Sequence, residues 1–457
     1  MGYDLSVDEM VAMRREANTP HGESVGPDFE RMMEDIERIL LPSEKTPIST
    51  AKILGQMELE FLEPVLKGFY KKTSCYPPLA MLRGVMLGKK KKLSWRRLKR
   101  YLIVYPDEAK QLGFIDEGGW IKIPSHEHFR TFVQERVDWD QIRDATVKEL
   151  CAIGEENDIA VGSETVEDST MIETIENDPD ARYNGHYKKK GLKEDLITCR
   201  ATGLPLVNET IGGTECEGYS LIRQLEHLLE LGVDIKDHWV DGTYATFENI
   251  AISHALLGIT LHFQVQEGWI VKKEGKSKHI KKLYQTFWQD PEFHPGITLD
   301  EMMVLLATRG RTIVEQGRKL QQSALSDGAW GDDKRPKRGR PTNAERVAQE
   351  QFFESERVIN KGLRLLEPVG AYHRNAVMEK AKKDPEWMKK DKGKRQLSES
   401  INNHLKNDLG LQDDLRVKGM KKVHIHDTFG CVFLLLVGLH KMRYGEKKNL
   451  ASLVGIE

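Results

Sequence analysis

Residues 159–265 alternate between short strand patterns and helix patterns, and this order constrains the fold more than any other feature of the chain. Gly203 separates two stretches with strand character, which predicts an antiparallel hairpin. The order of strand, hairpin, helix, strand, helix and strand predicts a mixed α/β sheet flanked by helices. The predicted elements are strands at 159–166, 196–202, 204–211, 238–241 and 259–265 and helices at 218–231 and 247–257.

The chain has 457 residues, which at about 150 residues per domain gives roughly two to four domains. Changes of composition along the chain predict five segments. They are a polar, helical segment at 1–55, a compact all-helical domain at 56–150, the first part of the α/β core at 151–266, an inserted and mostly helical subdomain at 267–385, and the final part of the core at 386–457.

Charge is balanced overall but strongly segregated. Lys and Arg total 69 and Asp and Glu total 71, so the net charge is −2, which excludes a uniformly basic coat protein and a highly charged disordered chain. Residues 81–100 nevertheless contain nine basic residues and no acidic one. A helix at 77–87, a break at Gly88 and the lysine run, and a second helix capped by Ser94 together resemble a helix-turn-helix. The second helix would offer Arg96, Arg97, Lys99 and Arg100 to phosphates.

Two further basic patches lie downstream. Arg338-Gly339-Arg340-Pro341 resembles an AT-hook, in which the two arginines would lie in a narrow A·T minor groove. The stretch 272–282 carries six lysines. Each patch also has an ordinary structural interpretation, either a solvated helix face or a flexible basic linker. Three patches on a neutral chain favour a polyanionic partner.

The remaining bulk features favour a cytoplasmic protein. The five cysteines are scattered without a Cys-x-x-Cys pair, which argues against a zinc ribbon and a disulfide framework. The longest apolar run, 431–439, is too short to span a bilayer, and the residues MGYDLSVDEM contain no apolar signal core. We therefore expect no membrane association. A GxxxxGK[ST] loop is absent, so nucleotide hydrolysis is not expected.

Three carboxylates occupy positions suited to metal chemistry. Asp168 is predicted to end the first strand of the α/β region, Asp241 to end a later strand beside it, and Glu399 to lie on a helix at 395–409. Hard carboxylate oxygens suit Mg²⁺ or Mn²⁺, and such a trio can hold two cations for in-line phosphoryl transfer. With 71 acidic residues in the chain, the trio needs its sequence context to carry weight.

That context resembles the bacterial insertion-sequence transposases of the DDE class, which have a ribonuclease-H-like catalytic domain. Asp168-Ser169-Thr170 resembles the family's first aspartate block, and Asp241-Gly242-Thr243-Tyr244 is similar to its Asp-x-x-Tyr block. Arg395, Glu399 and Lys406 match its Arg-x3-Glu-x6-Lys signature. The family's tyrosine three positions before the arginine is replaced here by Lys392. The segment from Tyr76 to Arg96 also resembles the N-terminal domain of such transposases.

The resemblance implies that Asp168, Asp241 and Glu399 form the catalytic triad and bind two Mg²⁺ or Mn²⁺ ions. It implies DNA binding by the helical domain at 56–150, with double-stranded DNA at the terminal inverted repeats and at the target as partner, and a homodimer on DNA. A 3′-hydroxyl freed at the end of the element would attack a target phosphodiester. The expected location is the bacterial cytoplasm, in association with the nucleoid.

The spacing of the third motif agrees with this role. Positions 395, 399 and 406 lie along one face of an α-helix, so Glu399 can reach metal while Arg395 and Lys406 reach phosphates. The ordinary interpretation is an exposed helix with an i,i+4 ion pair. Two further alternatives remain open: a catalytically silent DNA-binding protein derived from a transposase, and a metal-dependent nuclease that cuts without joining.

Several other titratable residues are expected to be structural. His238, on the opposite strand face from Asp241, is predicted to be packed, and Glu167 is interpreted as a solvated charge that could shift a local pKa. His424 and His426 alternate on one face of a possible strand, without a third metal ligand beside them.

Overall fold

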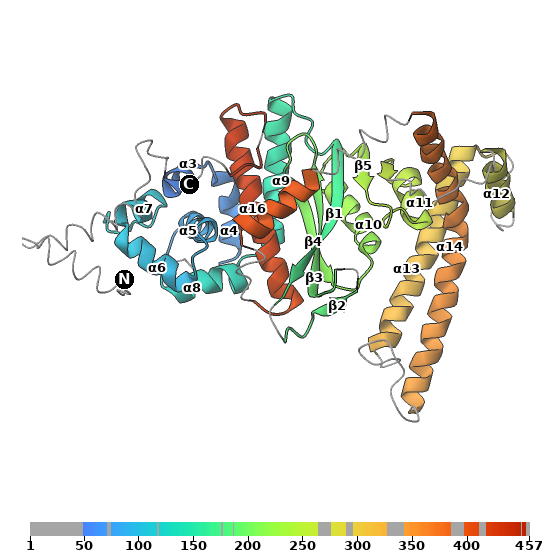
Figure 1. Cartoon of the computed structure of the whole chain (residues 1–457), viewed down its shortest axis with the longest axis horizontal. Helices are drawn as coiled ribbons and strands as arrows, with labels where there is room; N and C mark the ends of the chain where they lie inside the picture. Colours follow the sequence, from blue (N-terminus) through green and yellow to red (C-terminus); the bar gives the residue numbers. More distant parts are fainter. Residues whose placement is uncertain are drawn as a thin grey trace, which may run out of the picture. The chain divides into compact units, whose positions relative to one another are not determined.

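The computed structural model divides the chain into two compact units, each treated by itself (Figure 1). The helical unit comprises Met1–Ile153, Thr174–Pro179 and Asn403–Glu457, and the sheet unit comprises Gly154–Glu173 and Asp180–Asn402. The division after Ile153 lies close to the predicted boundary at 150, whereas residues from Asn403 onward group with the helical unit rather than with the core. The structure describes residues 49–70, 75–116, 118–174, 177–185, 187–263, 276–288, 296–326, 342–384, 397–410, 417–448 and 450–453.

The described part of the helical unit is built almost entirely of helices, as predicted for 56–150. One isolated bridge between Ile115 and Ile121 is the exception among its described residues. The helices are α3 (Thr50–Gln56), η1 (Glu60–Leu62), α4 (Glu63–Gly68), α5 (Pro78–Lys90), α6 (Trp95–Val104), α7 (Pro106–Gln111), α8 (His126–Thr131), η2 (Phe132–Arg136), α9 (Trp139–Glu156), η4 (His404–Asp408) and α16 (Met420–Arg443).

Helix α16 is the apolar centre of the helical unit. It is a single helix, so His424 and His426 do not lie on the strand considered for them from the sequence. It is long and apolar enough to cross a membrane, but 78% of its most apolar window is buried inside the protein, as in the core helix of a folded domain. The ring of Phe429 lies 4.3 Å from that of Trp139 on α9.

The sheet unit contains a mixed six-stranded sheet, which confirms the predicted α/β core. The strand order is β2-β3-β1-β5-β6, and β4 also pairs with β3. Strand β1 is antiparallel to β3 and parallel to β5, which is in turn parallel to β6. The strands are β1 (Glu164–Glu173), β2 (Arg182–Asn184), β3 (Lys189–Cys199), β4 (Pro205–Gly212), β5 (Asp237–Val240) and β6 (Thr260–Phe263). The turn between β3 and β4 uses Gly203 at φ +70°, a conformation that favours glycine.

Helices follow the strands in the predicted order. After η3 (Glu217–Tyr219), α10 (Leu221–Glu230) contacts β4, and α11 (Phe247–Ala255) connects β5 to β6 and contacts β6. These helices bury apolar residues such as Leu225, Leu228 and Ile250 against the rest of the unit. The parallel pairing of β5 and β6 through α11 is the ordinary strand-helix-strand arrangement.

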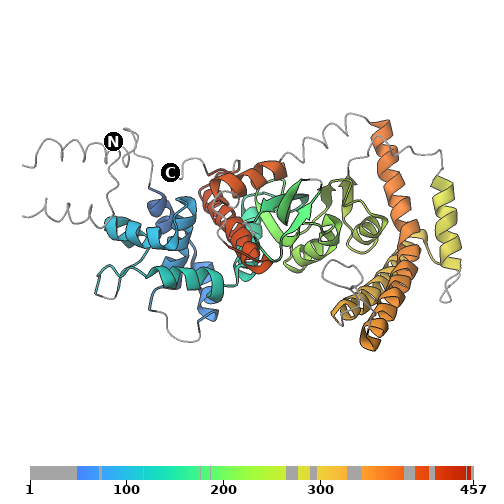
Figure 2. The same ribbon diagram turned by 60° about the horizontal axis from the view of Figure 1, so that its bottom comes forward.

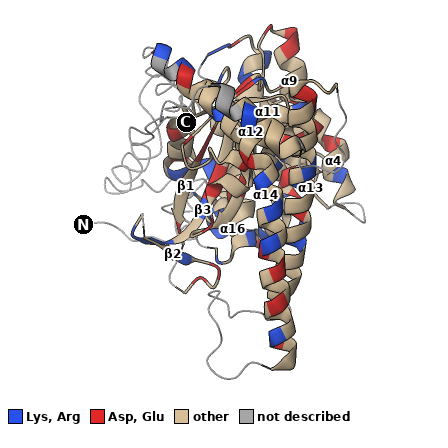
Figure 3. Ribbon diagram, turned by 90° about the vertical axis from the view of Figure 1, so that its right-hand side faces the viewer, with Lys and Arg blue, Asp and Glu red and all other residues tan. Residues whose placement is uncertain are grey.

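The inserted region is helical wherever the structure describes it. Helices α13 (Leu299–Ser326) and α14 (Asn343–Lys383) lie side by side as a long pair, preceded by α12 (Lys276–Trp288), as Figures 1 and 2 show. The two helices pack closely at their glycines: the carbonyl oxygen of Gly310 lies 2.6 Å from the position that a Cβ on Gly362 would occupy. Positive and negative residues are interspersed along both helices (Figure 3), so neither forms a basic stripe.

Candidate functional site

Asp168 lies on β1, and Asp241 directly follows its parallel neighbour β5. Strands β1 and β5 pair from Glu164 with Asp237 to Val166 with Trp239, and continuing this register by two residues sets Asp168 beside Asp241. Adjacent strands lie about 4.8 Å apart, so the two backbones are close at this point. The predicted adjacency of the two strands is therefore confirmed.

The strand ends differ from the prediction. Asp168 does not end its strand, because β1 continues to Glu173 while β3 pairs with it along its length. It is β5 that ends at Val240, where Asp241 turns and its Oδ1 accepts a hydrogen bond of 2.5 Å from the backbone N–H of Gly242. Beyond that point β1 has no parallel neighbour among the described strands, which leaves this edge open beside both aspartates.

A tyrosine that the sequence did not single out lies beside the two aspartates. Both Asp168 and Asp241 are partly exposed, and so is Tyr187. The pKa of Tyr187 is raised, first by burial and then by the negative charges of Glu217, Asp168 and Asp241. Three carboxylates therefore lie within electrostatic reach of one phenol. Glu217 is also paired with the buried Lys193, at 2.9 Å between Nζ and Oε1.

Behind this edge lies a fully buried polar chain. The hydroxyl of Thr165 lies 2.7 Å from Nδ1 of His238, and Nε2 of His238 lies 2.8 Å from Oε2 of Glu167. Glu167 in turn shares a hydrogen bond with Asp195. Glu167, His238 and Asp195 are each 0% exposed. The interpretation of Glu167 as a solvated charge was wrong, whereas the prediction of a packed His238 is confirmed.

Burial determines the protonation of these hydrogen-bonded side chains. It raises the pKa of Glu167 to about 8 and raises that of Asp195 well above its usual range, where the charge of Glu167 adds to the effect. Burial also lowers the pKa of His238 to about 3, so the imidazole is neutral. These directions are consistent with one proton held between the two carboxyl groups, with His238 donating from Nε2 to Glu167 and accepting at Nδ1 from Thr165.

Asp195 also contacts the turn that carries Asp241. The hydroxyl of Tyr244 donates to Oδ1 of Asp195 at 2.6 Å, and the Tyr244 side chain is fully buried. Ser220 donates to Oδ2 of the same carboxyl group, as does Nε2 of Gln224 at 3.3 Å. The sequence gives no clear signal for Asp195, because it ends a charged stretch, Lys193-Glu194-Asp195, that β3 nevertheless buries.

The third motif is only partly within the described residues. Arg395 lies outside them. Glu399 is exposed on a helical stretch at 397–403 and belongs to the same compact unit as the two aspartates. Lys406 lies in η4, a π-helical turn that begins at His404, so the α-helical spacing used to place it on one face with Glu399 does not hold across this segment. The division between the two units also falls between Glu399 and Lys406.

Two of the three predicted ligands fit a hard divalent cation. Asp168 and Asp241 offer partly exposed carboxylates side by side, which is the donor chemistry that Mg²⁺ or Mn²⁺ prefers. Among the described residues, however, no group of three or more His, Cys, Asp or Glu is arranged to hold a metal ion. Glu399 therefore does not join the aspartates in such a group.

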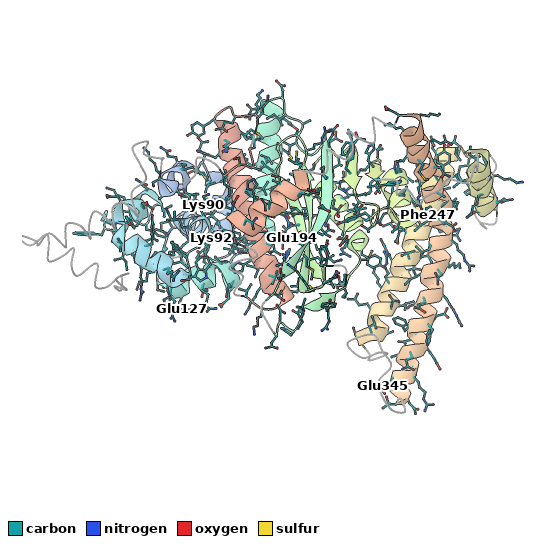
Figure 4. The ribbon with its side chains drawn as sticks, viewed as in Figure 1. Lys90, Lys92, Glu127, Glu194, Phe247 and Glu345 are labelled. Atoms are coloured by element: carbon teal, nitrogen blue, oxygen red, sulfur yellow. The ribbon has the colours of Figure 1, made fainter. Side chains whose placement is uncertain are left out.

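The basic segment of the helical unit forms two helices around a four-residue turn. Helix α5 ends at Lys90, not at Gly88, which is buried inside the helix with Leu98 3.0 Å from where its Cβ would be. The break comes at Lys92, whose φ is +51°, and Figure 4 labels Lys90 and Lys92 at this end of α5. Ser94 caps α6 as predicted, accepting from the backbone N–H of Arg97.

Several cations of α6 are available to a ligand. Arg96, Arg97 and Arg100 are exposed and Lys99 is partly exposed. A short turn between two helices, with exposed arginines on the second, suits phosphate contacts. Arg338 and Arg340 lie outside the described residues, as do Lys272 and Lys273 of the third patch.

The two late histidines lie on helix α16, not on a strand. Nε2 of His424 lies 3.1 Å from Oδ2 of Asp140 on α9. His426 is half-buried, and desolvation lowers its pKa to about 3. Both contribute to the interior of the helical unit.

Comparison with known proteins adds no assignment. No protein-family model matches the chain, and no match was found among curated proteins or solved structures.

Proposed function

We propose that the protein is a DNA transposase of the DDE class, with a ribonuclease-H-like core, that cleaves the ends of an insertion sequence and joins them to target DNA. The observation that carries the proposal is the parallel pairing of β1, which contains Asp168, with β5, which Asp241 directly follows. A mixed sheet with antiparallel neighbours on one side of β1 and parallel neighbours on the other is compatible with such a core. The motifs at 168–170, 241–244 and 395–406 are what a transposase of this class requires.

Different residues of the chain would hold the metal ions and contact the DNA. Asp168 and Asp241, joined by Glu399 when DNA is bound, would hold Mg²⁺ or Mn²⁺, which supplies activation of an attacking oxygen and stabilisation of the leaving oxygen in phosphoryl transfer. Arg96, Arg97, Lys99 and Arg100 bind backbone phosphates of the element's end. Arg395 and Lys406 contact phosphates near the scissile bond, and Arg338 and Arg340 contact a minor groove. The protein acts as a homodimer on DNA, in the bacterial cytoplasm.

The test is divalent-metal-dependent cleavage of the DNA that flanks the protein's own gene. Wild type, Asp168→Asn, Asp241→Asn and Glu399→Gln are compared, with Asp234→Asn as a control, because Asp234 is an exposed acid of the same unit. We expect cleavage by wild type and the control only, with DNA binding kept by all five proteins. Cleavage by either aspartate variant at the wild-type rate would remove that residue from the site.

A second candidate is a DNA-binding protein that has lost turnover. It is favoured by one observation, that the described residues contain no three-ligand metal group that includes Glu399. It predicts DNA binding through α6 with no cleavage by the wild type in Mg²⁺ or Mn²⁺. Joining products on a plasmid target would separate a transposase from a nuclease that only cuts.

A further inference from the structure

A buried hydrogen bond ties the turn that carries Asp241 to the sheet. Tyr244 follows Asp241 by three residues, and its backbone N–H donates to the carbonyl of Asp241 at 3.1 Å, which closes the turn. Its side chain leaves the turn for the interior, where its hydroxyl donates to Asp195 at 2.6 Å. A buried phenol hydroxyl without this acceptor would be costly, so the bond selects one position for the turn.

Asp195 is itself held from several directions. Besides Tyr244, its carboxyl group accepts from Ser220 and Gln224 and shares a hydrogen bond with Glu167. These four partners in a buried site leave the carboxyl group little freedom to move, and three of them remain when Ser220 is replaced. Tyr244 is therefore anchored on a fixed point and not on a mobile side chain.

Asp195 also connects to the strand that carries Asp168. In the antiparallel ladder of β3 with β1, Asp195 pairs with Ser169, the residue next to Asp168. One residue thus contacts the Asp168 strand through its backbone and the Asp241 turn through its side chain. The separation of the two aspartates depends on both connections.

We infer that Asp195 and Tyr244 are positioning residues, which set the separation of Asp168 and Asp241 and thereby the affinity of the site for a divalent cation. The inference rests on the proposed function in that it takes the two aspartates as metal ligands. Neither residue touches substrate in this role, because both are buried and act through the turn.

The hydroxyl of Tyr244 can be removed without dismantling the turn. The side-chain amide of Asn249 donates to the carbonyl oxygens of Tyr244 and Gly218, at 2.9 and 2.8 Å, and these bonds do not involve the phenol. Tyr244→Phe keeps the buried ring and loses only the bond to Asp195. We therefore expect a folded protein whose Asp241 turn is less tightly fixed.

The experiment measures Mn²⁺ affinity directly, by electron paramagnetic resonance of free Mn²⁺ without DNA, together with the Mn²⁺ concentration that half-saturates cleavage. Two matched controls accompany Tyr244→Phe. Ser220→Ala removes another donor to Asp195 that lies outside the Asp241 turn, and Tyr219→Phe makes the same chemical change at a side chain that is 61% exposed. Thermal unfolding and DNA affinity are measured for all variants.

We expect Tyr244→Phe to weaken Mn²⁺ binding by about five- to tenfold and to raise the half-saturating Mn²⁺ concentration to match, because small misplacements of site groups have large effects. Both controls should bind Mn²⁺ as wild type does, and DNA affinity should stay unchanged. Equal Mn²⁺ affinity in wild type and Tyr244→Phe would overturn the inference, and so would an equal loss in Ser220→Ala, which would indicate general damage to the core. If wild type binds Mn²⁺ through Asp168 and Asp241 but cleaves no DNA, the proposed function fails while the loss in Tyr244→Phe still supports the inference. If wild type binds no Mn²⁺, the inference fails as well.

Discussion

Two neighbouring carboxylates on β1 have opposite environments. Asp168 is partly exposed and lies beside Asp241, whereas Glu167 is fully buried and shares a hydrogen bond with Asp195. The difference follows from strand geometry, because successive side chains point to opposite faces of a sheet. A carboxylate is thus accessible to solvent at Asp168 and part of the buried interior at Glu167.

The exposed pair, Asp168 and Asp241, and the buried pair, Glu167 and Asp195, differ in the ionisation state that suits them. A metal site needs ionised, accessible carboxylates, and Asp168 and Asp241 remain partly exposed beside the end of β5. The buried pair is stable because it does not carry two full charges: burial raises both pKa values, and one proton can be shared. Substitutions at the two pairs should therefore affect different properties.

The largest effect is expected at the exposed pair. Asp168→Asn should lower the cleavage rate by about 10³-fold or more, because a bound divalent ion supplies several kcal/mol of transition-state stabilisation and about 1.4 kcal/mol is tenfold in rate. The free energy of unfolding should change by less than about 1 kcal/mol, because a partly exposed carboxylate is replaced by an amide of equal size. Rate and urea unfolding are measured on the same preparation. A large loss of stability would contradict the assigned division of roles.

Asp195→Ala should lower the free energy of unfolding far more than Asp168→Asn does. It leaves Tyr244, Ser220 and Gln224 without their acceptor and Glu167 without its partner, all in a buried site. Truncating one member of a buried charged network costs about 3–5 kcal/mol of unfolding free energy. Urea denaturation measures the loss, and Asp234→Asn serves as the surface control. A change below about 1 kcal/mol would show that the network contributes little.

The alternating sequence pattern predicted the mixed sheet, the hairpin around Gly203 and the neighbouring strands β1 and β5. Asp195 was missed because the predicted strand began at residue 196, whereas β3 begins at Lys189. The charged stretch Lys193-Glu194-Asp195 normally indicates a solvent-facing position, and nothing local shows that Ser220 and Gln224 would surround Asp195.

Other differences arise where the local backbone departs from regular geometry. The π-helical turn at His404–Asp408 has no simple sequence signal, and it invalidated the spacing argument for Lys406. The end of α5 was placed at Gly88, but that glycine allows close packing with Leu98 and the helix ends two residues later. In both cases packing, and not residue propensity, determines the geometry.

Charge reversal on α6 should affect DNA binding without affecting the buried network. Replacing Arg96, Arg97 and Arg100 by Glu should weaken DNA binding by about 10²-fold at low salt. The slope of the logarithm of the binding constant against the logarithm of the salt concentration should become shallower by about 0.9 per lost phosphate contact. Fluorescence anisotropy at several salt concentrations measures both. Arg357→Glu is a matched reversal at an exposed arginine of α14, in the sheet unit. Unchanged binding by the α6 variant would remove this helix from the interface.

The smallest effect concerns the pH dependence of stability. The pKa of Glu167 is about 8 in the folded protein and near 4.5 in the unfolded chain, so the folded state holds more protons between these values and stability falls as pH rises through them. His238 acts oppositely: its pKa of about 3 lies below the unfolded value near 6.5, so its contribution is lost as pH falls from 6.5. Between about pH 6.5 and 8, of these two groups, only Glu167 changes stability, and it lowers it.

Glu167→Gln isolates this contribution because glutamine reproduces the protonated carboxyl group. Its carbonyl can accept from His238 while its amide donates to Asp195, so the buried chain stays satisfied. We expect the decline in unfolding free energy between pH 6.5 and 8 to become shallower in the variant. The rise between about pH 4.5 and 6.5 should become steeper, because Glu167 no longer opposes His238 there. Urea unfolding at half-unit pH steps measures both limbs. An identical alkaline slope in wild type and Glu167→Gln would mean that Glu167 does not carry the buried proton, and that the two carboxylates of β1 differ in exposure but not in ionisation.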